Sequence, residues 1–317
     1  MCRVQTVVCA VHLSLGGAEM KKCQNIIVGI ELSESAQQIL ERALEWAKRF
    51  GAKLHVVHAI EFTMSQRWDA FPLRFQEVKE RLEAGAWEKL EGMLEALPDK
   101  EHLGKSFVRW GRPDTVLAKL ADEVDADLCL VGKINRTALE RAMVGSTSRR
   151  LIRQLALPIL ALAPDATDRL KQVVIPVDFS EASEAALRDG IACAKREGAK
   201  VHILHVYEFL SVMPMIELWT KEDIQKLNDE AKEMVQEQMD TFLQPFDLDG
   251  VDVEIHLNEG YVFDEIVRFV RGCEADLLVM GSIGRSGIQS VLLGNTAERV
   301  IHNAPCSLMI IKPEMTS

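Results

Sequence analysis

The residues of this sequence best suited to chemistry lie in one glycine-containing stretch near the C-terminus, GSIGRSGIQSVLLGNTAERV. Three glycines and an asparagine are spaced there as G-x2-G-x9-G-N, at Gly281, Gly284, Gly294 and Asn295. Glycine lets main-chain N–H groups approach a ligand without a Cβ in the way. A helix that begins at Asn295 would add unpaired N–H donors and the positive end of its dipole, which suit phosphate.

Two neighbouring features strengthen this interpretation. Arg285, inside the loop, has the charge for an assisted hydrogen bond to phosphate. Asn295 with Glu298 three residues later fits a capping box, which predicts the start of the helix. The same residues also fit a plain strand-to-helix turn that binds nothing. The spacing matches neither a Walker A loop nor the G-x-G-x-x-G dinucleotide pattern.

The elements that must position this loop occur twice in the chain. GAKLHVVHAIEF (51–62) aligns with GAKVHILHVYEF (198–209) at an offset of 147, with seven of twelve positions identical. DADLCLVG (125–132) aligns in the same way with EADLLVMG (274–281). The repeat of about 140 residues is a whole domain, and two such domains fit a chain of this length. We predict a leader at 1–23, with Met20 as the native start, a first domain at 24–164 and a second at 171–313.

Within each copy, apolar strand-like runs alternate with amphipathic helix-like segments. Ser33 and Ser180 are candidate N-caps for the helix after the first strand. The expected strands are 25–30, a run ending at 61, 106–110, 128–131 and 159–163, and in the second copy 172–177, a run ending at 208, 253–257, 277–280 and 308–311. This alternation predicts an α/β fold with a parallel sheet covered on both faces. Ligands of such sheets bind outside the carboxyl ends of the strands.

A long helix is predicted before the third strand of each copy from apolar residues at three- and four-residue steps. We expect one mostly apolar stripe that packs on the sheet. The stripe consists of Phe75, Val78, Leu82, Ala86, Leu90, Met93 and Leu97 in the first copy and of Ile224, Leu227, Ala231, Met234, Gln238 and Phe242 in the second.

The glycine spacing, together with V-D-F-S at 177–180, resembles the universal stress protein family, and 281–313 resembles its tandem, UspE-type members. The resemblance covers 24–313 as two copies. It implies two Rossmann-like domains, related to adenine nucleotide α-hydrolases, each a five-stranded parallel sheet flanked by helices. It also implies pairing through the last strand, as an intramolecular pseudo-dimer of the two domains or a homodimer. Its ATP-binding members hold the base and ribose near the first two strands and the phosphates, with Mg²⁺, on the glycine loop.

Carried onto this sequence, the resemblance implies that Pro176, Val177 and Asp178 lie near adenosine, with Asp178 as an acceptor. The main chain of Val206 would meet the adenine. The implied phosphate-binding residues are Gly281, Gly284, Gly294, Asn295, Thr296 and Ala297. Asp178 also fits a simple turn before Ser180.

The first copy departs from this pattern. Gly132, Gly145 and Ser146 keep the spacing, but Asn135 replaces the second glycine, and its side chain would crowd a phosphate. Glu31, Gly29 and Ala59 stand in place of Asp178, Pro176 and Val206. We therefore predict that the second domain binds ATP more tightly than the first.

The same segment of the first copy is basic, with Lys133, Arg136, Arg141, Arg149 and Arg150. Two interpretations stay open for it. One is an anion site of a different kind, and the other, which we favour, is a set of solvated arginines on a helix.

Composition narrows the function further. The net charge is −11, which disfavours nucleic acid as a partner, and no apolar stretch reaches the roughly 18 residues of a membrane span. The seven cysteines include no CxxC pair, so we expect buried thiols in a reducing, cytoplasmic compartment. The two HxxH motifs suggest zinc, but residues three apart on a strand point to opposite faces and no third ligand is evident. We therefore predict no metal site in the protein itself.

The leading hypothesis is a cytoplasmic, ATP-binding regulatory protein of the stress response with an unidentified protein partner. No general base is identifiable beside the loop, so ATP hydrolysis would be slow at most. The alternative is a non-enzymatic scaffold that binds a protein or an apolar ligand, with the loop a relic. A metabolic enzyme of the nucleotide α-hydrolase group is disfavoured because its catalytic motifs are missing from the sequence.

Overall fold

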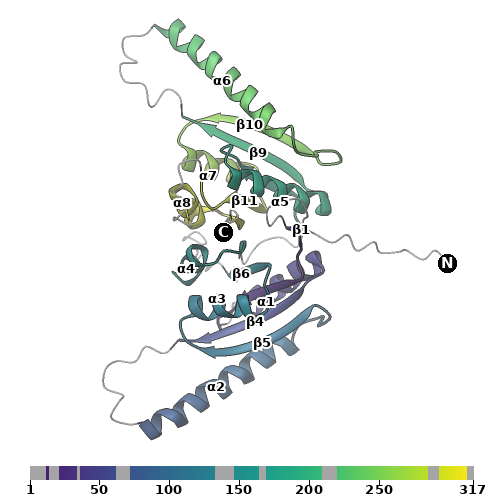
Figure 1. Cartoon of the computed structure of the whole chain (residues 1–317), viewed down its shortest axis with the longest axis vertical. Helices are drawn as coiled ribbons and strands as arrows, with labels where there is room; N and C mark the ends of the chain where they lie inside the picture. The colour runs from purple at the N-terminus through teal and green to yellow at the C-terminus, as the bar shows by residue number, and fades with distance from the viewer. Residues whose placement is uncertain are drawn as a thin grey trace, which may run out of the picture. The chain divides into compact units, whose positions relative to one another are not determined.

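The structure is a computed structural model that describes residues 12–13, 21–33, 36–61, 72–132, 146–163, 169–208, 220–284 and 293–312. The chain divides into two compact units, the first mainly 20–134 with 144–164 and the second mainly 165–317. We call them the first and second domains (Figure 1). Two short strands, β1 (His12–Leu13) and β2 (Lys21–Lys22), pair antiparallel ahead of the first domain's sheet.

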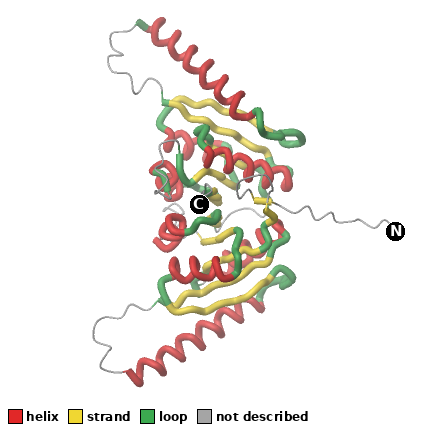
Figure 2. The backbone as a smooth tube through the Cα atoms, in the orientation of Figure 1, coloured by secondary structure: helices red, strands yellow, loops and turns green. Residues whose placement is uncertain are grey.

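Strands and helices alternate in both domains, as the sequence predicts (Figure 2). The first domain contains β3 (Asn25–Gly29), α1 (Ala36–Phe50), β4 (Lys53–Ile60), α2 (Pro72–Glu95), β5 (Leu103–Trp110), α3 (Pro113–Glu123), β6 (Leu128–Gly132), α4 (Ser146–Gln154) and β7 (Ile159–Leu162). The second contains β8 (Gln172–Pro176), α5 (Glu181–Glu197), β9 (Lys200–Tyr207), α6 (Lys221–Leu243), β10 (Val253–Glu259), α7 (Val262–Gly272), β11 (Leu277–Gly281), α8 (Asn295–Asn303) and β12 (Ser307–Ile311).

Each domain is built on five parallel strands, which confirms the predicted fold class. The order is β5-β4-β3-β6-β7 in the first domain and β10-β9-β8-β11-β12 in the second. Right-handed crossovers place the first two helices of each domain on one face and the last two on the other. Accordingly α3 packs with α4, and α7 packs with α8. The order reverses direction beside the first strand, so each domain is doubly wound.

The central strands are apolar on both faces because both faces are covered by helices. Ile26, Ile27 and Val28 of β3 are fully buried. An aspartate before the fourth strand ties that strand to the start of the first in each domain. Asp127 Oδ2 accepts hydrogen bonds from the N–H groups of residues 24 and 25 at 2.8 and 3.0 Å. Asp276 Oδ2 does the same for residues 171 and 172 at 2.7 and 2.9 Å, so the repeat extends to its polar contacts.

The long helix α2 packs on the sheet through only part of its predicted stripe. Ala86 and Leu90 are buried, whereas Val78 and Leu82 are 39% and 44% exposed. A 24-residue helix is about 36 Å long and an eight-residue strand about 26 Å. The first turns of α2 therefore extend past the strands (Figure 1), and the prediction of one continuous packed stripe is wrong there.

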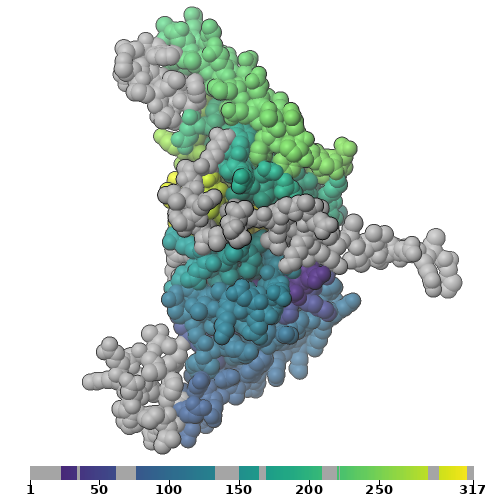
Figure 3. Space-filling model, viewed as in Figure 1, coloured from purple at the N-terminus to yellow at the C-terminus, as the bar shows by residue number. Residues whose placement is uncertain are grey.

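The stripe predicted for α6 is also wrong in its second half. Met234 is 55% exposed and Gln238 is exposed, while Ala231, Met239 and Leu243 are buried. Because the helical repeat is 3.6 residues, residues on one face follow one another in steps of three or four. The predicted steps lead from Ala231 to Met234 and Gln238, whereas the buried face contains Ala231, Met239 and Leu243. The opposite side of α6, green in Figure 3, lies on the surface.

The cysteines of the described residues carry thiols rather than disulfides. Cys23, Cys129, Cys193 and Cys306 are buried, and Cys273 is half-buried. Burial raises the pKa of the Cys129 thiol to about 12, which makes that thiol unreactive. The two remaining cysteines, at positions 2 and 9, lie outside the described residues. Among the helices that are described, none combines the length and the apolar character of a membrane span.

Candidate functional site

The candidate site lies where β8 and β11 end side by side in the second domain. β11 pairs with β8 in parallel, and the chain leaves β8 toward one edge of the sheet and β11 toward the other. Two loops meet at this reversal of direction. One is 177–180, which leads into α5, and the other is the connection to α8, of which residues 281–284 and 293–294 are described. Such a switch point is where open α/β sheets bind ligands.

The first loop is shaped by Asp178 and Ser180. The Asp178 Oδ1 atom accepts hydrogen bonds from the Ser180 N–H at 3.2 Å and from the Ser180 hydroxyl at 2.5 Å. Ser180 caps α5, as predicted, and forms a capping box with Ser183. Asp178 is thus a turn residue, one of its two predicted roles.

The other oxygen of Asp178 reaches the second loop. A Cβ added at Gly284 would lie 2.6 Å from Asp178 Oδ2. The carboxylate is therefore packed directly against the Gly284 main chain. This contact joins the two loops, and it requires glycine at position 284.

Phe179, between the two residues of the turn, has a left-handed backbone with φ of 62°. That conformation costs a non-glycine residue about 1–2 kcal/mol. The ring compensates by stacking on His205 at a centroid distance of 4.3 Å and by meeting Phe242 edge-on at 5.3 Å. His205 in turn donates from Nδ1 to the Val177 carbonyl at 2.8 Å. The second histidine of the HxxH motif therefore supports the first loop.

The helix α8 begins without a side-chain cap. Gly294 is the N-cap, with φ −76° and ψ 158°, and its carbonyl accepts the first helical bond from Glu298 N at 2.9 Å. The predicted capping box of Asn295 and Glu298 is wrong, because Asn295 is already the first helical residue. The N–H groups of Asn295, Thr296 and Ala297 consequently make no hydrogen bond to another described residue.

The three glycines of the second loop have different neighbours. A Cβ at Gly281 would lie 2.8–2.9 Å from the main chain and Cβ of Ala182, so glycine there permits packing against α5. A Cβ at Gly294 would lie 3.5 Å from Ser282 O and 3.7 Å from Gly284 N. Gly294 thus lies in ordinary contact with the main chain of residues 282–284, and Gly281 packs against α5.

Ser282 adds a polar group at this point that the sequence analysis missed. The residue is fully buried, and its hydroxyl has no hydrogen-bond partner within the described ranges. Its carbonyl accepts from Gly294 N at 2.7 Å and thereby closes the loop. A buried hydroxyl of this kind has unused capacity to bond a polar ligand.

Most of the predicted site residues lie together at this end of the sheet. Pro176 ends β8 and Val177 follows it, and Val206 is the second-last residue of β9, paired with Asn258 of β10. Ala297 is buried, so only its main chain is available. Arg285 lies outside the described residues.

The corresponding end of the first domain differs. Glu31 is exposed, whereas its counterpart Asp178 is half-buried. A Cβ at Gly29 would overlap the Leu117 side chain of α3, which explains the glycine in packing terms. Asn135 and Gly145 lie outside the described residues. The weaker nucleotide affinity expected of this domain stays a prediction.

One arginine of the basic segment has a defined partner. Arg150 Nε lies 3.4 Å from Asp114 Oδ2, and Arg112 Nη2 lies 2.6 Å from the same oxygen. Burial raises the pKa of the Asp114 carboxyl, but the hydrogen bond from Arg112 and the charges of both arginines outweigh burial and lower it. Arg150 is thus an ion-pair partner of Asp114, and its side chain is also 42% exposed, as the interpretation as a solvated arginine expects. The described side chains do not include those of the other basic residues, Lys133, Arg136, Arg141 and Arg149.

The second domain replaces that ion-pair cluster by an aromatic contact. Arg299 of α8 is the counterpart of Arg150, and Phe263 of α7 is the counterpart of Asp114. The Arg299 guanidinium lies 4.1 Å from the centre of the Phe263 ring. Both contacts join the last two helices of their domain. The pair of residues therefore has the same structural role in both domains, but it is an ion pair in the first and a cation–aromatic contact in the second.

The HxxH prediction is half right. His202 contacts Phe269 of α7, whereas His205 stacks on Phe179, whose ring in turn meets Phe242 of α6. The two histidine side chains therefore lie on opposite faces, as expected. The expectation that no third ligand group lies nearby is wrong, because Glu254 and His256 of β10 lie beside His202. The sequence gives no direct sign of this, since it depends on the register between two strands.

The two successive doubly wound domains define a tandem Rossmann-like protein. The profile of the universal stress protein family matches residues 22–162 and 169–312. The chain therefore belongs to the universal stress protein family.

Relatives of the same tandem length support this assignment. A universal stress protein of Mycolicibacterium smegmatis is 25% identical over 295 residues, covering 91% of this chain and 97% of its own. Universal stress protein E of Salmonella typhi is 24% identical over 308 residues, covering 93% and 96%. A shorter universal stress protein of Methanocaldococcus jannaschii is 34% identical over 142 residues, which cover 45% of this chain and 82% of its own.

Solved structures show the same fold. A universal stress protein from Archaeoglobus fulgidus has a TM-score of 0.60 and 20% identity, covering 92% of this chain and 98% of its own. A functionally unknown protein from Pseudomonas aeruginosa has a TM-score of 0.62 and 18% identity, covering 92% and 93%.

Proposed function

We propose that the second domain binds ATP, with the phosphates at the start of α8. The observation that carries this proposal is that the N–H groups of Asn295, Thr296 and Ala297 make no hydrogen bond within the described ranges, next to Gly294, which lies against the Gly284 main chain. Three N–H donors at a helix N-terminus favour an anion through their hydrogen-bonding capacity and the helix dipole. Glycine at positions 284 and 294 leaves no Cβ to obstruct the approach of an anion to these groups.

The remaining site residues fit the rest of the nucleotide. Pro176, Val177 and Asp178 at the end of β8 would border adenosine, with the Asp178 carboxylate accepting from a ribose hydroxyl. The Val206 main chain, on the adjacent β9, would meet the adenine. The buried Ser282 hydroxyl and Arg285 would face the phosphates. Mg²⁺ bound through the phosphates would partly neutralise their charge.

The proposed activity is regulatory binding in the cytoplasm with slow ATP hydrolysis at most. The main-chain donors of α8 and the Ser282 hydroxyl would meet the phosphates, and the Asp178 carboxylate is held in a turn by Ser180. Such a site stabilises bound phosphate without activating water. A bound nucleotide would then act by changing the conformation of loops 177–180 and 281–294 and the affinity for a protein partner.

The test is whether the purified chain carries nucleotide that heat denaturation releases, and whether it binds a fluorescent ATP analogue. We expect Gly284→Val and Asp178→Ala to abolish both signals. Gly272→Ala is the matched control, because no atom lies within 4 Å of a Cβ added there. Glu31→Ala, at the first domain's counterpart of Asp178, controls for loss of a carboxylate. Unchanged binding in Gly284→Val and Asp178→Ala would contradict the site and favour a scaffold function.

A further inference from the structure

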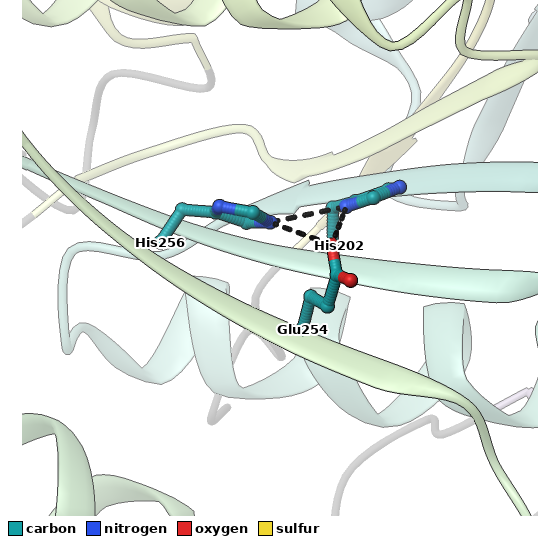
Figure 4. Close-up of side chains that lie close together, drawn as sticks. All are labelled: His202, Glu254 and His256. Atoms are coloured by element: carbon teal, nitrogen blue, oxygen red, sulfur yellow. Dashed lines mark hydrogen bonds and ion pairs between the residues drawn. The ribbon is translucent and has the colours of Figure 1, made fainter.

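A cluster of three side chains on the second domain's sheet is separate from the nucleotide site. His202 lies near the start of β9, and Glu254 and His256 lie on β10 (Figure 4). His202 is paired in register with Glu254, and His256 is two residues further along the same strand. Residues two apart on a strand share a face, so the register alone brings the three side chains together. Val206 lies four residues, or about 13 Å, further along β9.

The donor atoms of this cluster converge on one point. His202 Nδ1 lies 3.1 Å from His256 Nε2 and 3.5 Å from Glu254 Oε2, and His256 Nε2 lies 3.7 Å from Glu254 Oε2. Ligands about 2.1 Å from a tetrahedral zinc ion are roughly 3.4 Å apart. The three separations scatter around this value. A metal ion at the usual bond length from all three atoms therefore fits with little movement.

Neighbouring groups orient two of the three donor atoms. His202 donates from Nε2 to Gln172 Oε1 at 2.7 Å, which leaves the lone pair of Nδ1 facing the other two ligands. Lys200 Nζ holds Glu254 Oε1 at 2.5 Å, so the other carboxylate oxygen, Oε2, faces the histidines. Partners of this kind orient the ligands of metal sites.

Packing and protonation also suit a metal. The Phe269 ring lies 5.6 Å from the His202 ring and 4.5 Å from the His256 ring, which restricts both imidazoles. Burial lowers the pKa of both histidines, and Glu254 opposes this only in part. The Glu254 side chain is 48% exposed, which gives a water molecule access to a fourth position.

The first domain supplies an internal comparison. His55 is the counterpart of His202, but Lys105 and Phe107 stand at the counterparts of Glu254 and His256. The Nδ1 atom of His55 accepts a hydrogen bond from Lys105 N at 3.1 Å and is not available to a metal. The cluster is thus particular to the second domain.

We propose that His202 Nδ1, His256 Nε2 and Glu254 Oε2 form a site for one divalent transition metal of the zinc type, with water as the fourth ligand. Two histidines and a glutamate are an established ligand set for Zn²⁺ with one open position. The site does not depend on nucleotide, and it lies away from the carboxyl ends of the strands.

The test uses the full-length, tag-free chain after removal of metals by a chelator, without nucleotide. Co²⁺ is added as a spectroscopic probe, and Zn²⁺ binding is measured by calorimetry. We expect one equivalent of each metal to bind and Co²⁺ to give the intense visible absorption of a tetrahedral site. Glu254→Lys and His256→Phe, which install the first domain's residues, should weaken binding at least about 100-fold, and Gln172→Leu about 10–100-fold.

His102→Phe is the matched control, because it removes a half-buried histidine of the first domain that lies outside the cluster. Its affinity should equal that of the unchanged chain, and circular dichroism should show that all variants are folded. Absence of the Co²⁺ absorption, unchanged affinity in Glu254→Lys and His256→Phe, or a thiolate charge-transfer band from cysteine ligation would each overturn the proposal. Any of these results would mean that the three side chains form only a hydrogen-bonded cluster.

Discussion

Replacing the loop glycines one at a time by alanine should separate folding from nucleotide binding. At Gly281 the new Cβ would lie 2.8–2.9 Å from main-chain atoms of Ala182, which cannot rotate away. Overpacking of this kind costs about 1–3 kcal/mol, which lowers Tm by roughly 3–10 °C for a domain of this size. Gly281→Ala should therefore lower stability while the folded fraction keeps its affinity for ATP.

At Gly284 the nearest atom is the end of a side chain. The new Cβ would displace the Asp178 carboxylate, which can rotate, so we expect at most about 1–2 kcal/mol from weakened bonds to Ser180. Displacement of this carboxylate also moves the proposed acceptor for the ribose hydroxyl out of its position. Gly284→Ala should therefore weaken ATP binding at least about tenfold, which corresponds to 1.4 kcal/mol.

At Gly294 the nearest neighbours lie at an ordinary 3.5–3.7 Å, and its φ of −76° suits any residue. We expect a stability loss below about 1 kcal/mol and a loss of affinity similar to that at Gly284. The assays are thermal unfolding by circular dichroism and titration with a fluorescent ATP analogue. The reasoning fails if Gly281→Ala leaves Tm unchanged, or if Gly284→Ala and Gly294→Ala bind ATP as tightly as the unchanged chain.

Two further predictions concern contacts outside the loop. Asp114→Asn should destabilise the first domain by about 2 kcal/mol, a value below that of a fully buried pair because Arg112 and Arg150 are 54% and 42% exposed. The pKa of Asp114 is lowered in the folded state, so its contribution to the free energy of unfolding is present above the unfolded pKa of about 3.9 and is lost on acidification. The free energy of unfolding in urea should therefore differ less between pH 7 and pH 3 in Asp114→Asn than in the unchanged chain. His205→Phe removes the donor to the Val177 carbonyl, so it should lower stability by about 1–3 kcal/mol and weaken ATP binding. His58→Phe removes the equivalent bond to the Ile30 carbonyl and should lower stability alone. Equal effects of the two variants in an ATP titration would contradict the role of His205.

The fold could be predicted from the sequence because its signals are local and repeated. Buried parallel strands appear in the sequence as apolar runs such as Ile26–Val28, and the second copy has a matching apolar run 147 residues later. Ser180 is predicted correctly as a cap because the interaction is local: its side-chain oxygen accepts a hydrogen bond from the main-chain N–H three residues later. Each of these inferences needs only neighbours along the chain.

The predictions that were wrong depend on geometry that neighbouring residues do not fix. Whether Gly294 or Asn295 caps α8 depends on main-chain angles, and the glycine has the extended conformation. The buried face of α6 depends on which of two helical steps meets the sheet. The proximity of His202 to Glu254 and His256 depends on a one-residue choice of register between parallel strands whose connection spans 208–252.

Because the cluster of His202, Glu254 and His256 depends on strand register, exchanging side chains alone should not transfer it from the second domain to the first. In the second domain β10 pairs with β9 one residue to one residue, from Val201 with Val253 to Tyr207 with Glu259. In the first domain β5 contains one extra residue, because Leu54 pairs with Leu103 but Val56 pairs with Ser106. The extra residue turns the main-chain N–H of Lys105 toward His55.

We therefore expect that Lys105→Glu with Phe107→His does not create a metal site around His55. The introduced side chains match Glu254 and His256, but the bond from the main-chain N–H of residue 105 keeps the His55 Nδ1 lone pair occupied. The measurement is Co²⁺ absorption of the double variant, made in a chain that also carries Glu254→Lys and His256→Phe so that the second domain is silent. Appearance of the tetrahedral absorption would show that side-chain identity, rather than strand register, decides which domain binds metal.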